Sequence, residues 1–275
     1  MDHSEFIKRK IEYIIKAYEE DIAREKHLRL CLYGEKGTGK TTTACTGRKP
    51  VYLQSFEPGG TLSSRIQEMV KAGDVYIDAS WEKRKLEDPK VIQDWITEMK
   101  ALEENGFFKQ IGTFVVDSLS MLSEYLATNV VVADTKNNTR STGAPTMQLQ
   151  NYVPFQSRLL NIMKSFVGLP CDVVMIGHIS RIRDDVTGSD KTGLNIIGEK
   201  TSSKITQVFG ELWVTRTAAD SKGRRYELVT QRDGLYDACT RLGDGIFSTI
   251  EKQDITDLLK KAGWPIEKRT ASFNN

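Results

Sequence analysis

The chain has 275 residues and a formal net charge of +2, from 39 lysines and arginines against 37 aspartates and glutamates. This length suits one large α/β domain with small appendages, and the near balance of charge neither demands nor forbids a nucleic-acid partner. No run approaches the roughly 18 apolar residues of a membrane span, and the first residues lack the basic and apolar regions of a signal peptide. We therefore expect no membrane partner.

Four cysteines are spread along the chain without a C-x-x-C pair: Cys31, Cys45, Cys171 and Cys239. This spacing argues against a zinc site and against a disulfide framework. Unpaired cysteines are typical of a reducing compartment, so the expected location is the cytoplasm.

Residues 4–26 have apolar side chains at helical spacing, with lysine and glutamate on the opposite side. The apolar positions are Phe6, Ile7, Ile11, Ile14, Ile15, Tyr18 and Ile22. The pattern predicts an amphipathic helix, and we treat residues 1–27 as an N-terminal helical segment ahead of the core. Two interpretations stay open: the stripe packs on the domain's own sheet, or it docks on a neighbouring subunit.

Residues 28–33 read as a buried strand, and the next eight residues, GEKGTGKT, match the phosphate-binding pattern G-x-x-x-x-G-K-[ST] at every specified position. Glycines let the backbone N–H groups surround a polyphosphate. The ammonium of Lys40 suits the β- and γ-phosphates, and the hydroxyl of Thr41 is a ligand for Mg²⁺. The stretch predicts binding of a nucleotide, taken to be ATP, through Gly34, Glu35, Lys36, Gly37, Thr38, Gly39, Lys40, Thr41 and Thr42.

The helix after this loop is expected to be short, because Gly47 and Pro50 end it within about two turns. Residues 51–56 then read as a second strand, which leads directly into Glu57. The next expected elements are a helix over 62–72, a short strand over 75–77 and a helix from 89 to about 104.

Residues 111–117 form a β-branched apolar run that ends in Asp117. A buried parallel strand of this kind brings its last carboxylate to the carboxyl edge of the sheet. In phosphate-loop enzymes that carboxylate holds the Mg²⁺ shell. A strand that ends in aspartate is a weak signal by itself. Downstream of the phosphate loop, however, it predicts that Asp117 binds the metal together with Thr41.

The rest of the chain continues to alternate between helical and strand patterns. Expected helices cover 119–132, 154–167, 200–209 and 250–262, and expected strands cover 172–178, 211–217 and 225–231. The polar stretches 134–150 and 183–195 read as an exposed loop and a mobile segment. We place the core in residues 28–250, and a C-terminal helix and tail in residues 251–275.

With these elements placed, the chain resembles the RecA-like branch of phosphate-loop ATPases, and more narrowly the phage nucleotide-binding proteins of the Sak-type single-strand annealing group. The resemblance is carried by GEKGTGKTT from Gly34, QSFEPGG from Gln54, FVVDSLSML from Phe114 and VVMIGHIS from Val173. It implies an α/β fold with a mostly parallel, twisted sheet flanked by helices. It also implies that the strand ending in His178 lies between the phosphate-loop strand and the Asp117 strand.

The resemblance implies catalytic roles for Glu57, His178 and Lys40. Asp117 is followed by Ser118, as in the RecA-like group, where the general base comes from the end of the second strand; Glu57 has that place here. His178 stands where the family usually has a glutamine facing the γ-phosphate, so it is expected to act as a sensor, while Lys40 stabilises phosphate charge. The plainer alternatives are a solvated turn residue for Glu57 and a core histidine for His178.

Two arginines, Arg232 and Arg241, are in the region from which RecA-like filaments reach the ATP of the neighbouring subunit. A surface position or a local salt bridge is equally open for each. The stretches 134–150 and 181–197 match the loops that line the DNA path, and their cations are Lys136, Arg140, Arg181 and Arg183. Nearby aspartates balance these charges, so the expectation of DNA binding depends on the resemblance and not on charge.

The resemblance as a whole implies an ATPase that forms a homo-oligomer or filament on single-stranded DNA, for annealing or strand exchange. If the gene is a phage gene, the compartment is the cytoplasm of the bacterial host. An alternative is a RecA-like, ATP-driven switch that acts on a protein partner without DNA. A small-molecule kinase is a third reading, but the sequence has no cluster of lid arginines to support it.

Overall fold

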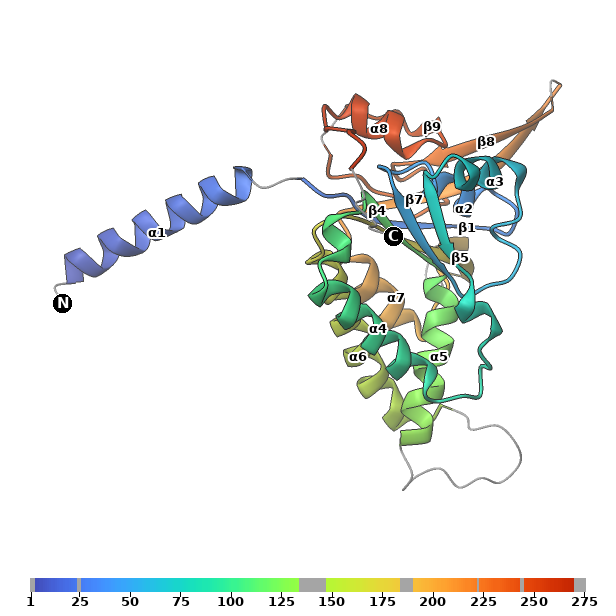
Figure 1. Ribbon diagram of the computed structural model, residues 1–275, viewed down its shortest axis with the longest axis horizontal. Helices are drawn as coiled ribbons and strands as arrows, with labels where there is room; N and C mark the ends of the chain where they lie inside the picture. Colours follow the sequence, from blue (N-terminus) through green and yellow to red (C-terminus); the bar gives the residue numbers. More distant parts are fainter. Residues whose placement is uncertain are drawn as a thin grey trace.

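The structure is a computed structural model that describes residues 3–23, 26–133, 147–183, 190–221, 223–242 and 245–269. Figure 1 shows a helix-flanked sheet and, standing away from it, the N-terminal helix α1, His3–Ala23. No helix within these ranges is long and apolar enough to cross a bilayer.

One sheet runs through the described part of the chain, in the order β3-β2-β4-β5-β1-β7-β8-β9, with β6 paired to β5. The strands from β3 to β7 along this order are parallel, while β8 and β9 are antiparallel additions at one edge. The bounds are β1 Arg29–Gly34, β2 Val51–Ser55, β3 Val75–Asp78, β4 Thr113–Asp117, β5 Asp172–Arg183, β6 Asp190–Leu194, β7 Glu211–Asp220, β8 Gly223–Val229 and β9 Ile250–Lys252. The central strands are nearly continuous apolar runs because both of their faces are covered.

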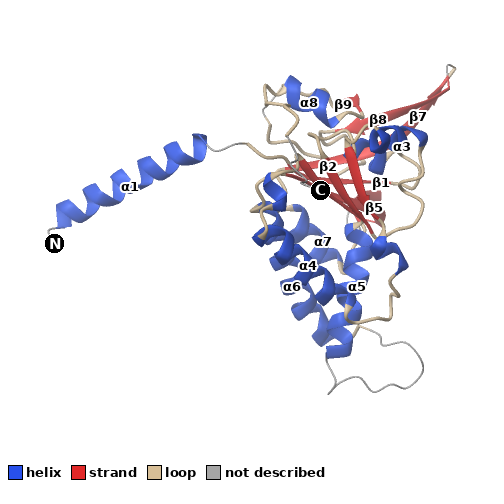
Figure 2. Ribbon diagram, in the orientation of Figure 1, coloured by secondary structure: helices blue, strands red, loops and turns tan. Residues whose placement is uncertain are grey.

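Helices cover both faces of the sheet (Figure 2). Their bounds are α2 Lys40–Ala44, α3 Ser64–Lys71, α4 Val91–Glu104, α5 Leu119–Ala133, α6 Leu149–Val167, α7 Glu199–Thr206 and α8 Ile255–Lys261, with 3₁₀ turns at Ser80–Lys83 and Phe107–Lys109. The helices α4, α5, α6 and α7 pack on one face around Trp95, Phe114 and Phe155, and α2, α3 and α8 pack on the other around Leu32 and Ile66. The expected α/β fold, a mostly parallel sheet flanked by helices, is confirmed.

Strand β5 lies between β1 and β4, as the resemblance implied. Gly34 at the end of β1 pairs with His178, and Asp117 at the end of β4 pairs with Ile176 of β5 and with Ser55 of β2. Because the carboxyl ends of these strands meet, the phosphate loop, Asp117 and His178 share one edge of the sheet.

Helix α6 begins at Leu149, five residues before the expected start, so Pro154 lies inside it. The backbone N–H of Gln148 donates to Oδ1 of Asn151 at 2.9 Å, which starts the helix ahead of the proline. At this position proline removes one backbone hydrogen bond and crowds the carbonyl four residues earlier, but it does not end the helix. The loop expected over 134–150 therefore ends earlier, and residues 134–146 lie outside the described ranges.

The chain after His178 continues as strand, which corrects the mobile segment expected over 183–195. Strand β5 pairs antiparallel with β6, from Ile179 opposite Leu194 to Arg183 opposite Asp190. The polar composition concealed this hairpin, since its stability comes from cross-strand hydrogen bonds and not from an apolar pattern. Residues 184–189 lie outside the described ranges.

The closing helix expected over 250–262 is shorter than predicted. Residues Ile250–Lys252 form β9 at the edge of the sheet, and α8 begins only at Ile255. The carboxylate of Asp254 accepts a hydrogen bond from the N–H of Asp257 at 3.1 Å. This N-cap marks the true start of the helix.

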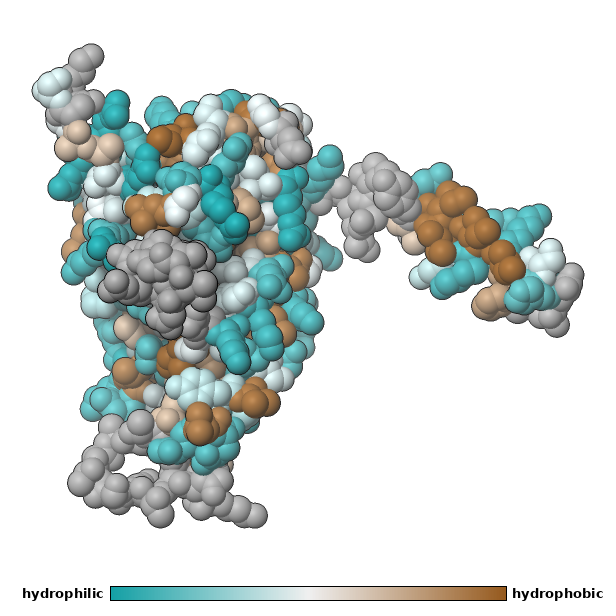
Figure 3. Space-filling view, turned by 180° about the vertical axis from the view of Figure 1, so that it is seen from behind, coloured by the Kyte–Doolittle hydropathy of each residue, from teal (hydrophilic) through white to brown (hydrophobic). Residues whose placement is uncertain are grey.

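Helix α1 carries its apolar stripe into solvent. Phe6, Ile7, Ile11, Ile14 and Ile15 are 44–54% exposed, and Figure 3 shows apolar side chains gathered along this helix. The interpretation that the stripe packs on the domain's own sheet is therefore wrong for this structure. Docking on a neighbouring subunit stays a prediction.

Candidate active site

The phosphate loop joins β1 to α2, and glycines determine its path. Gly37 and Gly39 have φ values of 78° and 91°, in the left-handed region that other residues rarely adopt. A Cβ at Gly34 would lie 2.4 Å from the carbonyl oxygen of Thr215 on β7. Backbone geometry and the close approach to the sheet therefore require glycine at these positions.

Lys40 opens helix α2 and is 8% exposed. Its ammonium donates to the carbonyl oxygens of Gly34, at 3.1 Å, and Glu35, at 2.8 Å. Burial lowers the pKa of Lys40, while the charges of Asp117 and Glu57 oppose this shift. Phosphate oxygens are stronger hydrogen-bond acceptors than neutral carbonyl oxygens. The Lys40 ammonium can therefore exchange its two carbonyl contacts for contacts to phosphate oxygens.

Thr41 and Asp117 form the candidate metal site. The Thr41 hydroxyl donates to Oδ2 of Asp117 at 2.6 Å, and burial raises the pKa of Asp117 to about 6 against the effect of that hydrogen bond. A Cβ at Gly60 would lie 3.1 Å from Oγ1 of Thr41 and 3.2 Å from Oδ2 of Asp117, so glycine keeps this space open. Mg²⁺ prefers oxygen ligands, and at phosphate-binding sites the protein supplies only a few of them while the phosphates supply others. The Thr41 hydroxyl and the Asp117 carboxylate are ligands of this kind. These residues fit Mg²⁺ held together with a nucleotide.

Glu57 follows β2 and reaches the same edge of the sheet. Nε2 of His178 lies 2.9 Å from Oε1 and 2.7 Å from Oε2 of Glu57, and the Ser118 hydroxyl donates to Oε1. Burial alone would raise the pKa of Glu57, but the hydrogen bonds from His178 and Ser118 outweigh burial and lower it. Glu57 is therefore an ionised carboxylate, the form that a general base needs.

Backbone contacts hold His178 at the root of the hairpin formed by β5 and β6. Its N–H donates to Oγ of Ser120 at 2.9 Å, and that hydroxyl donates to the carbonyl oxygen of Asn195 at 2.7 Å. The N–H of Asn195 donates back to the carbonyl oxygen of His178 at 2.9 Å. The imidazole is 33% exposed and lines the cleft, unlike a core histidine.

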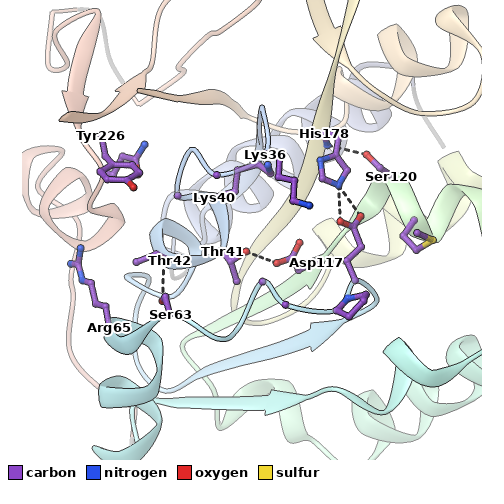
Figure 4. A pocket seen from close by; sticks show the side chains of 18 of the residues that line it. Lys36, Lys40, Thr41, Thr42, Ser63, Arg65, Asp117, Ser120, His178 and Tyr226 are labelled. Atoms are coloured by element: carbon purple, nitrogen blue, oxygen red, sulfur yellow. Dashed lines mark hydrogen bonds and ion pairs between the residues drawn. The ribbon is translucent and has the colours of Figure 1, made fainter. Parts of the chain in front are cut away.

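A cleft of about 1320 Å³ runs along the phosphate loop (Figure 4). Lys40, Asp117 and His178 lie toward one end of it, so the predicted catalytic and metal-binding residues are neighbours. At the other end, across the phosphate loop, stand Tyr226 of β8 and Arg65 of α3.

Sequence reasoning missed Gln253, and with it the two residues at the far end of the cleft. Gln253 follows β9 and is 8% exposed. Its Nε2 donates to the carbonyl oxygens of Thr38 and Glu227, both at 2.9 Å, and its Oε1 accepts from the Thr43 hydroxyl at 3.0 Å. Gln253 therefore holds the phosphate loop from a position 215 residues away from Thr38, which no local pattern reveals.

The two arginines predicted to act across subunits do not line the cleft of their own chain. The Arg232 side chain is 76% exposed and forms an ion pair with Asp237, beside a second cavity of about 410 Å³. Arg241 is exposed, and its N–H donates to Glu211 at 2.8 Å. A role at ATP would require a second copy of the chain, and that role stays a prediction.

The residues predicted to contact DNA are only partly described. Nη2 of Arg181 donates to Oε1 of Glu35 at 2.8 Å, which ties the hairpin to the phosphate loop. The backbone of Arg183 lies in β5, whereas Lys136 and Arg140 lie outside the described residues. The positive charge of Arg181 is thus offset by a carboxylate of the same chain.

Residues 26–242 match a family described as an AAA domain. The chain belongs to this AAA domain family. As a member of the AAA domain family with an intact phosphate loop, it is expected to have nucleoside-triphosphatase activity in general. The match does not reach the narrower phage annealing group, which stays a prediction.

No curated protein matches the chain. Among solved structures, it is similar to the flagellar accessory protein FlaH from Methanocaldococcus jannaschii, with 13% identity over 74% of this chain and 78% of that one and a TM-score of 0.35. It is also similar to a KaiC-like protein from Pyrococcus horikoshii OT3, with 11% identity over 77% and 82% and a TM-score of 0.40. Neither likeness is close enough to bear on function.

Proposed function

We propose that this chain binds ATP with Mg²⁺ and hydrolyses it, with Glu57 as the general base. The observation that carries the proposal is the meeting of Lys40, Thr41, Asp117 and Glu57 in one cleft, with Glu57 bonded to His178. These four residues cover three tasks in phosphoryl transfer to water: Lys40 for the phosphates, Thr41 and Asp117 for the metal ion, and Glu57 for the water.

The binding groups come from the phosphate loop and from Asp117. The N–H groups of the phosphate loop and the ammonium of Lys40 would hold the phosphates, and Thr41 and Asp117 would hold Mg²⁺, which would neutralise phosphate charge. The Lys40 ammonium would exchange its contacts to the carbonyl oxygens of Gly34 and Glu35 for phosphate oxygens.

Glu57 acts on the attacking water. Its lowered pKa keeps it ionised, so it orients the water and takes its proton. His178 contacts both carboxylate oxygens of Glu57, and the same imidazole lines the cleft where the γ-phosphate would lie. We assign it a positioning and sensing role between the phosphate and the base.

The proposal extends to assembly on single-stranded DNA, for annealing or strand exchange. Its support is the resemblance to RecA-like ATPases and the hairpin that leaves the sheet directly after His178. Charge adds little, since Arg181 is paired with Glu35.

Two measurements on the full chain test the proposal. The first is Mg²⁺-dependent phosphate release from ATP, which Lys40→Ala should abolish while circular dichroism stays unchanged. The second is binding of a fluorescent single-stranded oligonucleotide with and without ATP, over a salt series, in which affinity should fall as salt rises. Hydrolysis without DNA binding at any salt would favour the alternative, an ATP-driven switch acting on a protein partner.

A further inference from the structure

We propose that Tyr226 and Arg65 form the subsite for the nucleotide base, with the base stacked on the Tyr226 ring. This inference depends on the proposed function, because it requires that the phosphate loop binds a nucleoside triphosphate. It adds the part of the ligand that the phosphate-loop motif does not address, namely the nucleoside.

The direction of the nucleotide follows from the residues already placed. Lys40, Asp117 and Glu57 mark the end of the cleft that takes the γ-phosphate, because the lysine of this motif reaches the β- and γ-phosphates. The α-phosphate and the nucleoside must then extend past the start of helix α2, toward Thr42. The cleft continues in that direction and ends at Tyr226 and Arg65 (Figure 4).

The Tyr226 ring lies against the phosphate loop. A Cβ at Gly39 would be 3.3 Å from Cδ1 of Tyr226, yet Tyr226 is 50% exposed. Its backbone is fixed in β8, opposite Thr217 of β7, and Gln253 beside it is bonded to both the loop and β8. An aromatic ring with an open face, carried on a paired strand at the nucleoside end of a phosphate site, is suited to stack on a base.

Arg65 comes to the same end from the opposite wall. It is in the first turn of α3, whose N-cap Ser63 has its hydroxyl 3.4 Å from that of Thr42. The Arg65 side chain is 52% exposed, and its guanidinium lies 3.8 Å from Asp254. A planar guanidinium held loosely in this way can stack on the second face of a base.

Stacking on Tyr226 sets an expectation for selectivity. Every base has a π-face, so stacking tolerates any base. The polar side chain next to the ring, Gln253, already uses its amide N–H groups and its oxygen within the protein. The contribution of Tyr226 should therefore be similar for ATP and for GTP.

The test is isothermal titration calorimetry of wild-type, Tyr226→Ala and Tyr226→Phe proteins with ATP, GTP and inorganic tripolyphosphate, all with Mg²⁺. Tyr226→Ala should weaken ATP and GTP binding by about 5-fold or more, the loss typical of one aromatic–base stack. Tyr226→Phe keeps the ring and should stay within about 2-fold of wild type. Tripolyphosphate lacks a base, so its affinity should be the same in all three proteins.

Each other outcome overturns the proposal in a recognisable way. Unchanged ATP affinity in Tyr226→Ala would place the base elsewhere. Equal weakening of ATP and tripolyphosphate would mean that Tyr226 supports the phosphate loop and does not contact the base. Failure of the wild-type chain to bind either ligand would contradict the proposed function itself, and Lys40→Ala, which should lose both ligands, provides the reference for that case.

Discussion

At the level of single residues, Glu57 has its carboxylate held by two neighbours of the same chain. His178 and Ser118 both hydrogen-bond to it, so its charge and its orientation are set by the protein. The general-base role depends on that charge, whereas nucleotide binding depends on Lys40 and the phosphate loop. The two functions should therefore separate on mutation.

Glu57→Gln should bind ATP with Mg²⁺ but hydrolyse it roughly 10²- to 10⁴-fold more slowly, because the amide keeps the shape and removes the basic group. Single-turnover hydrolysis and equilibrium binding, measured on the same preparation, check the two halves of this prediction. An unchanged turnover number would move the base to another residue, with Asp117 or Ser118 next to test.

Asp117 gives a pH dependence with a definite sign. Burial raises its pKa to about 6, so at pH 5 most of the free protein carries a protonated Asp117, and a proton must leave before Mg²⁺ can be held. The Mg²⁺-dependent affinity of the wild-type chain for a non-hydrolysable ATP analogue should be about 10-fold lower at pH 5 than at pH 7. Asp117→Asn serves as the control, because titration of the nucleotide itself affects both proteins. A pH profile identical in the two proteins would remove Asp117 from the metal site.

The sequence alone predicted those cleft residues that belong to short, recognisable motifs. Lys40 and Thr41 lie in one, and Asp117 and His178 each follow a recognisable apolar run. Gln253 and Tyr226 could not be found this way, because their importance comes from where β8 and β9 place them and not from their neighbours in the chain.

At the level of secondary-structure elements, a buried ion pair ties together the amino ends of β1 and β5. Asp172 opens β5, accepts the N–H of Leu28 at 2.7 Å, and lies 3.3 Å from the guanidinium of Arg48. Both side chains of the pair are 5% exposed or less. The strands that carry the phosphate loop and His178 therefore begin at a common fixed point.

Arg48→Ala should lower the free energy of unfolding by about 3–5 kcal/mol, because it leaves the buried Asp172 carboxylate without its partner. Arg84→Ala is the matched control: its ion pairs with Asp88 and Asp94 are partly exposed, so it should change stability by less than about 1 kcal/mol. Denaturant unfolding of the three proteins measures both values. Equal losses in the two variants would contradict the assigned role of burial.

Apolar periodicity predicted the central strands and most helices, since these elements are built from the pattern that buries them. It failed for the hairpin after His178 and for β9. Strand β9 lies at the edge of the sheet, and the hairpin lies outside the main strand order. In both places backbone hydrogen bonds, and not buried side chains, determine the structure.

At the level of the whole molecule, the described residues that line the cleft include no arginine at its phosphate end. Arg65 lies at the opposite end, and Arg232 and Arg241 lie elsewhere on the surface. Charge that develops on a transferring phosphoryl group is commonly met by an arginine from a neighbour. We therefore propose that an assembly of chains is more active than a single chain.

ATPase activity per chain should be weak in dilute protein and should rise with protein concentration or with added single-stranded DNA. Arg232→Ala or Arg241→Ala should flatten that rise without weakening ATP binding. Mixing either variant with Lys40→Ala protein should restore activity, because one chain supplies an intact cleft and the other its arginine. Activity strictly proportional to concentration, with no recovery on mixing, would make the monomer the working unit.

The contact between Gln253 and the phosphate loop also has a consequence for the order in which the protein is made. Thr38 and Gln253 are 215 residues apart, and a ribosome adds roughly 5–20 residues per second. The loop therefore leaves the ribosome on the order of 10–40 s before the glutamine that holds it. During that interval the nascent chain has the complete nucleotide motif but not the support that shapes it, so its ability to retain ATP should appear only after Gln253 has been made.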